Sequence, residues 1–188
     1  MKPIITGLLI TLILFTTGCE FANRNSAYKN KFKHENLDVI EELREAREPL
    51  FDNLISPLNK NQPLISASFA NIDNLSISST FGRMASEVIS AGLTERGYRV
   101  IEVKMRDSLF IKQGAGEFML SRQVQDVSEA HNAQAVLLGT YAVGGNNIYI
   151  NTRLVRSTDN IVLGSHDLKL PINSDIKHML GVQSRRSR

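Results

Sequence analysis

The most apolar strand-like stretch of the chain reads Ala135-Val136-Leu137-Leu138-Gly139-Thr140-Tyr141-Ala142-Val143. Apolar residues at consecutive positions are typical of a strand that is covered on both faces. We therefore expect residues 135–143 to lie at the centre of a sheet. Turn-forming residues at 144–147 predict a hairpin into an alternating strand at 148–156. A second turn at 157–160 leads into a last strand at 161–170.

Upstream of this stretch, strand and helix patterns alternate. Residues 64–70 read as a strand, and residues 98–105 alternate apolar and polar side chains as a second strand. Between them, serine and threonine residues suited to an N-cap precede a helix, and Gly97 fits the position after its last turn. The apolar stripe of this helix consists of Phe81, Met84, Ala85, Val88, Ile89 and Leu93. A strand–helix–strand unit predicts parallel pairing with a right-handed crossover.

Two further helices are predicted, one before this unit and one after it. The apolar face of the first, at 35–55, consists of Leu37, Ile40, Leu43, Leu50 and Leu54. Pro49 predicts a kink or a restart in this helix, and the charged residues, Arg47 among them, are expected to form its solvated side. The later helix is predicted to be capped by Ser121. Its apolar side consists of Val124, Val127 and Ala130. Residues 109–120 predict a short hairpin or an ordered loop.

These elements follow one another in the order α-β-α-β-α-β-β-β. Parallel pairing early and antiparallel hairpins late predict the α/β (α+β) class, a mixed sheet of about five strands with helices packed on it. We expect one such domain at 35–173. A short basic tail is expected at 174–188, with a last helical turn at 175–180.

Near the start of the sequence, Lys2 precedes an apolar run at 4–15. The run has the length of a signal-peptide core and is too short for a full membrane span. Small residues and Cys19 follow. This pattern resembles a bacterial lipoprotein signal at 1–18, cut before Cys19 so that the thiol carries lipid. A leucine is usual three positions before that cysteine and Thr16 stands there, so a secretory signal and an uncleaved anchor remain alternatives.

Residues 19–34 are polar and predict a flexible tether.

Composition excludes several classes of function. The net charge is only +3 and there is no tryptophan, whereas a nucleic-acid-binding protein should show a basic face, so we expect no nucleic-acid partner. Cys19 is the only cysteine. Once it is lipidated, no disulfide, cysteine nucleophile or thiolate metal site remains.

No pattern in the chain indicates catalytic residues, a metal site or a cofactor. The histidines are His34, His131, His166 and His178. No two of them have the i,i+3 or i,i+4 spacing of metal ligands on a helix. Gly114-Ala115-Gly116 lacks the third glycine of a dinucleotide-binding loop, since Met119 stands in its place. The members of a serine triad converge only in the fold, so an envelope hydrolase remains a third hypothesis.

Several short motifs follow one another along the domain. They are Asn61-Gln62-Pro63-Leu64-Ile65 running into Phe69, Ile72-Asp73-Asn74-Leu75, Ser79-Thr80-Phe81-Gly82-Arg83, Gly116-Glu117-Phe118-Met119-Leu120-Ser121-Arg122, and Leu138-Gly139-Thr140-Tyr141 followed by Val155 and the last hairpin. In this order they resemble the FlgO family of flagellum-associated outer-membrane lipoproteins, over roughly residues 37–170. The resemblance implies a small α/β envelope domain tied to the flagellum and motility, without catalytic residues.

The polar residues within these motifs are Asp73, Arg83, Asp107, Glu117 and Arg122. We expect them to bond loops and helix starts or to contact a partner. Glu20 follows the cysteine, and by resemblance to the lipoprotein sorting pattern it points to the outer membrane.

Two main hypotheses follow. In the leading one, the protein is a non-enzymatic outer-membrane lipoprotein, held at the membrane through Cys19, whose module binds another protein of the envelope or of the flagellar apparatus. The alternative is a periplasmic small-ligand-binding lipoprotein module, with its ligand at the carboxyl ends of the parallel strands.

Overall fold

The computed structural model describes residues 37–103, 110–113, 117–120 and 122–181, with side chains at 37–103 and 124–181. The expected signal, the tether, Cys19, the Gly114-Ala115-Gly116 turn and Ser121 lie outside the described residues, as does the tail beyond residue 181. The chain divides into two units, Met1–Leu37 and Asp38–Arg188. All the described helices and strands belong to the second unit.

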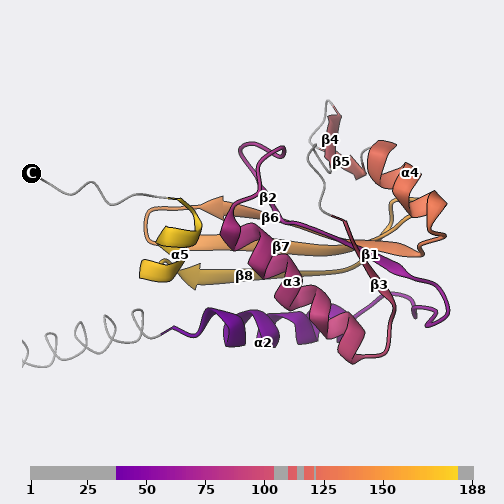
Figure 1. Ribbon diagram of the computed structural model, residues 1–188, viewed down its shortest axis with the longest axis horizontal. Coiled ribbons are helices and arrows are strands. Elements are labelled where there is room, and N and C mark those ends of the chain that lie inside the picture. Colours follow the sequence, from indigo (N-terminus) through magenta and orange to yellow (C-terminus); the bar gives the residue numbers. More distant parts are fainter. Residues whose placement is uncertain (1–36, 104–109, 114–116, 121, 182–188) are drawn as a thin grey trace, which may run out of the picture. The chain divides into compact units, whose positions relative to one another are not determined.

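This unit contains one main sheet, with helices packed on it (Figure 1). Its strands are β1 (Leu64–Ala67), β2 (Ala70–Asn71), β3 (Val100–Val103), β6 (Ala135–Val143), β7 (Asn147–Arg156) and β8 (Val162–Pro171). The order across the sheet is β3-β1-β6-β7-β8, and β2 also pairs with β6. The helices are α2 (Val39–Asp52), α3 (Thr80–Glu95), α4 (Arg122–Ala130) and α5 (Ser174–Met179). The mixed α/β class predicted from the sequence is confirmed.

Within the stretch at 109–120, where the sequence predicts a short hairpin or an ordered loop, the structure contains a separate two-stranded sheet. It consists of β4 (Phe110–Gln113) and β5 (Glu117–Leu120), paired antiparallel. Of the two alternatives for this stretch, the hairpin is therefore the one that the structure contains.

Strand β6 lies at the centre of the main sheet, as its apolar run predicts. It pairs in parallel with β1 and β2, and antiparallel with β7. Residues 135–139 of β6 are buried. The predicted strand–helix–strand unit is also confirmed, because β1 pairs in parallel with β3 across α3. Gly97 follows α3 with a φ of +82°, a conformation that costs glycine little.

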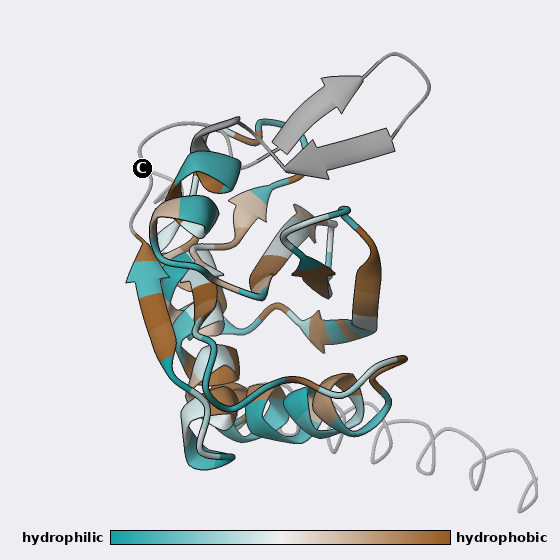
Figure 2. Ribbon diagram, turned by 90° about the vertical axis from the view of Figure 1, so that its right-hand side faces the viewer, coloured by the Kyte–Doolittle hydropathy of each residue, from teal (hydrophilic) through white to brown (hydrophobic). Residues whose placement is uncertain are grey.

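The two faces of the sheet are covered by different helices. Side chains alternate along a strand, so Leu137 and Tyr141 point to one face and Val136 and Leu138 to the other. The first, which we call the α3 face, packs against α3, and Tyr141 meets Phe81 edge to face. The second, which we call the α4 face, carries a buried cluster of Ile65, Ala67, Val124, Ala133, Val136, Leu138 and Val155. In Figure 2 brown, apolar residues recur along the strands, and the helices carry both teal and brown residues.

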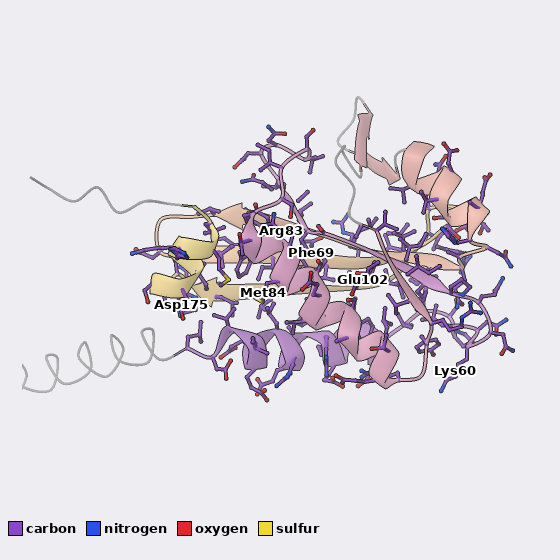
Figure 3. All side chains as sticks on the ribbon, in the orientation of Figure 1. Lys60, Phe69, Arg83, Met84, Glu102 and Asp175 are labelled. Carbon is purple, nitrogen blue, oxygen red and sulfur yellow. The ribbon has the colours of Figure 1, made fainter. Side chains whose placement is uncertain are left out.

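The strand expected at 64–70 is interrupted at residues 68–69, which separate β1 from β2. The side chain of Phe69 is fully buried and its ring lies on Gly139, where a Cβ atom would stand 2.5 Å from it. Figure 3 labels Phe69 between α3 and the strands. The break therefore serves to turn one aromatic ring onto the central strand.

Helix α2 differs from its prediction. It begins at Val39, because the side chain of Asp38 caps its first turn, and it does not restart at Pro49. The buried face is formed by Val39, Leu43, Ala46, Leu50 and Phe51, while the predicted face residue Ile40 is 44% exposed. Arg47, expected in solvent, is only 7% exposed. The expectation of a solvated charged side is wrong for Arg47, because α3 lies against it.

Candidate docking surface on the α4 face

Helix α4 covers only one end of the α4 face. Its apolar contacts lie over the part of β6 around Val136 and Leu138. In Figure 1, α4 and α5 stand at opposite ends of the long strands β6, β7 and β8. No described helix covers the half of the α4 face that lies beyond Leu138 in β6, and we call this part of the sheet the open half.

The strand register places two rows of three residues on the open half. Thr140, Asn151 and Asp167 lie side by side across β6, β7 and β8. The next row toward the hairpin places Ala142, Tyr149 and Lys169 side by side in the same way. Together with Ile72, which follows β2, they line a hollow of about 310 Å³.

Large apolar side chains stand in solvent around this hollow. Tyr149 is 48% exposed and Ile72 is 45% exposed, and both line the hollow. A cluster of exposed apolar side chains with a polar rim is typical of an interaction site, whereas single ones are ordinary. The rim here is polar, because the amide of Asn151 donates to Asp167 and Lys169 lies next to them.

A second hollow, of about 360 Å³, lies between the end of α4 and the β7–β8 turn. Its serine hydroxyls are committed to the backbone, since Ser128 donates to the carbonyl of Val124 and Ser157 to that of Ala133. Neither serine has a histidine beside it among the residues that line the hollow. This geometry does not form a nucleophile and base.

A charged cluster joins α2 to α3. Arg47 pairs with Glu95 and donates to the carbonyl of Val88, 3.2 Å away. Arg96 donates to Glu48 at 2.6 Å and to Asp52 at 3.1 Å. The hydrogen bond from Arg96 lowers the pKa of Glu48, and the same bond raises the pKa of Arg96. Each arginine has carboxylate partners, so the cluster fastens two helices rather than presenting a free charge.

The residues singled out from the sequence are not brought together. Cys19 and His34 lie outside the described residues, as do Asp107 and the side chains of Glu117 and Arg122. His131, His166 and His178 belong to separate segments of the fold. Among the described residues, no group of three metal-ligating side chains occurs.

One of the polar motif residues, Arg83, has the structural role expected of it, whereas the bond at Asp73 comes from its backbone. Arg83 donates to the carbonyl of Ser78 and to the hydroxyl of Thr80, so it bonds the start of α3, where Figure 3 labels it. The backbone N–H of Asp73 donates to the side chain of Asn71 within an exposed loop.

Sequence reasoning did not single out the residues of the open half. The alternation along 148–156 is a signal for one exposed row on that strand. The sequence offers no comparable signal for where α4 stops covering it. Among the described helices, none is both long and apolar enough to span a bilayer.

The fold is similar to several solved structures, all with TM-scores below 0.5. The LpoB C-terminal domain from Salmonella enterica is 13% identical, with 71% of this chain and 98% of that one covered, at a TM-score of 0.49. The PelC dodecamer from Paraburkholderia phytofirmans is 15% identical, covering 63% and 76%, at 0.41. Lipoprotein GNA1162 from Neisseria meningitidis is 19% identical, covering 61% and 82%, at 0.36.

A comparison with curated proteins found no match. The sequence model described as FlgO protein matches residues 44–175, which span all of the main sheet and well over half of the chain. This match agrees with the order of the motifs along the domain. The chain belongs to the FlgO family.

Proposed function

We propose that the protein is a non-enzymatic lipoprotein of the bacterial cell envelope, held in the outer membrane through Cys19, and that it serves the flagellum as an accessory component. The observation that carries this proposal is the FlgO match over residues 44–175. In the second hollow the hydroxyls of Ser128 and Ser157 are bonded to backbone carbonyls, which is compatible with a structural role for both serines.

The anchor is supported by the leader sequence. An apolar run at 4–15, small residues and then the only cysteine form the order that lipoprotein processing requires. One acyl chain binds a membrane only marginally, so stable attachment requires two or more chains. Glu20 after the cysteine favours the outer membrane. Replacing Cys19 with serine should move the protein from the membrane fraction to the soluble fraction, and unchanged partitioning would contradict the anchor.

The open half is the surface that we assign to the partner, an envelope protein with an apolar side chain for the hollow. Interfaces gain most from aromatic and aliphatic groups at the centre of a patch. Tyr149 and Ile72 occupy that place, with Asp167 and Lys169 at the rim.

The proposal is tested in a strain that lacks the gene. We expect it to swim poorly or to carry fewer flagella, and the wild-type gene to restore both. Ile72→Ser should fail to restore swimming although the protein is present at the normal level. Ile161→Ser is the matched control, because Ile161 is 44% exposed against 45% for Ile72 and does not line the hollow. Normal swimming in the deletion strain would overturn the flagellar role.

A second function is favoured by the position of the hollow. It lies beside the carboxyl ends of β2 and β6, the usual place for a ligand in an open sheet, and 310 Å³ suits a small molecule. In this alternative the protein is a periplasmic small-ligand-binding module. A specific ligand would raise the melting temperature of the wild type but not of Tyr149→Ser.

A further inference from the structure

Strand β8 forms one edge of the main sheet, because in the described sheet it pairs with β7 alone. The hydrogen bonds at the two ends of this pair show which backbone groups face β7. The N–H of Arg156 donates to the carbonyl of Ile161 at 2.8 Å, and the N–H of Ile172 donates to that of Asn146 at 2.9 Å. The even-numbered residues of β7 are therefore the hydrogen-bonded ones toward β8.

The register then fixes the outer groups of β8. The even-numbered residues of β7 pair with even-numbered residues of β8, so the N–H and C=O groups of these β8 residues point toward β7. The pairs are Ile148 with Leu170, Ile150 with Leu168, and Thr152 with His166. Successive residues of a strand direct these groups to opposite sides. The backbone groups of residues 165, 167 and 169 consequently point away from the sheet.

This edge is short and bounded at both ends. Near its start, the carbonyl of Leu163 accepts from the N–H of Ile55 at 2.9 Å. At its end stands Pro171, which has no N–H to donate. The side chains of Ser165, Asp167 and Lys169 are exposed on the α4 face. Helix α2 packs on the α3 face, where a Cβ atom on Gly164 would stand 2.8 Å from the carbonyl oxygen of Leu50.

We infer that β8 is the pairing edge for a second copy of this chain, and that the two β8 strands run antiparallel about a two-fold axis at Leu168. In this register Asp167 of each copy lies directly opposite Lys169 of the other. Both residues point their backbone groups outward, so each facing pair exchanges two N–H···O=C bonds. The surface is thus complementary to itself in charge as well as in hydrogen bonding, as a two-fold interface requires.

Charge also selects this register over its neighbours. A shift of the axis to residue 167 would set Asp167 against its own copy, and a shift to residue 169 would set Lys169 against its own copy. Like charges directly opposite each other are destabilising, whereas opposite charges contribute about 0.2–1 kcal/mol per pair. The pairing would join the α4 faces of two copies into one surface that carries both hollows.

Charge reversal in the full chain, purified in detergent, tests the inference by light scattering across a dilution series. Asp167→Lys and Lys169→Asp each create two like-charge pairs, and each should weaken self-association by roughly 30-fold, which is about 2 kcal/mol at 1.4 kcal/mol per tenfold. Mixing the two variants restores opposite charges at both positions and should restore dimers. A wild-type chain that is monomeric at every concentration overturns the inference, as does a mixture that stays monomeric.

Cross-linking tests the axis separately. Two residues at position 168 would form a non-hydrogen-bonded pair with Cα atoms about 4.5 Å apart, within reach of a disulfide. Leu168→Cys should therefore give covalent dimers on mild oxidation. Ser165→Cys is the matched control, because position 165 lies opposite Pro171 and far from its own copy. Equal cross-linking by both variants overturns the register.

The inference stands on the geometry of β8 and not on the proposed flagellar role. If the purified protein is monomeric but the deletion strain swims poorly, the β8 pairing is wrong and the proposed function stands. If the purified protein is dimeric but the deletion strain swims normally, the proposed flagellar function is wrong and the β8 pairing stands.

Discussion

Gly139 is a position where one added methyl group should destabilise the fold strongly. Its Cβ would stand 2.5, 2.6 and 2.7 Å from three atoms of the Phe69 ring, closer than real Cβ contacts. The ring cannot move aside easily, because it is fully buried. The backbone of Phe69 is also held, since its N–H donates to the carbonyl of Gly82 at 3.2 Å and its carbonyl accepts from the hydroxyl of Ser78 at 2.8 Å.

Overpacking of a well-packed core costs about 1–3 kcal/mol. Because three contacts are violated at once against an immobile ring, we expect Gly139→Ala to lie in the upper part of this range, about 2–3 kcal/mol. For a chain of this size that is a fall in melting temperature of roughly 4–12 °C. Thermal and urea unfolding, followed by circular dichroism, would measure it.

Two further variants make this reasoning refutable. Gly145→Ala is the matched control, because no atom lies within 4 Å of its Cβ position and its melting temperature should hardly change. Phe69→Leu loses ring packing by itself, but in combination with Gly139→Ala it should cost less than the sum of the two changes. A melting temperature of Gly139→Ala equal to that of Gly145→Ala, or strict additivity in the double variant, would refute the contact.

Three other outcomes are expected. Arg47→Ala should destabilise more than Arg47→Met, by about 1–2 kcal/mol in urea unfolding, because methionine keeps the buried stem while both lose the bond to the carbonyl of Val88. The hydrogen bond from Arg96 lowers the pKa of Glu48 below its ordinary value of 4.5. The bond therefore adds to the free energy of unfolding above pH 4.5, and this contribution is lost as the pH falls through the lowered pKa. The stability gap between wild type and Glu48→Gln should therefore narrow on acidification, by less than about 1 kcal/mol because the carboxyl is exposed. Tyr141→Phe should cost about 0.5–1.5 kcal/mol, because the phenol oxygen accepts from the backbone N–H at the start of α3.

Local patterns predicted the centre of the fold well. The apolar run at 135–143 identified the central strand, since only a strand covered on both faces needs apolar residues at consecutive positions. The parallel unit followed from a helix between two strands, and the turns followed from glycine and asparagine, including Asn160, whose φ is +60°. In each case the physical cause lies within a few neighbouring residues.

The errors concern contacts between distant segments. Arg47 reads as a solvated charge in its own helix, and its burial depends on Glu95 and Gly92 in α3, which no local pattern displays. Ile40 fits a helical stripe by spacing, yet the stripe that packs is the one that includes Leu43 and Leu50. The open half was missed for the same reason, because its exposure depends on where α4 ends.

The fastening of α2 to α3 has a mechanical consequence. The links at Arg47, Glu48 and Asp52 belong to the last two turns of α2, while the earlier turns are held by apolar packing such as that of Val39 and Leu43. A pull on residue 38 would peel these earlier turns away before it loads the charged links. Eight residues, 39–46, would extend to about 28 Å on the way. The first half of α2 would thus unfold and extend under force, and the extension would stop at the charged links that begin at Arg47.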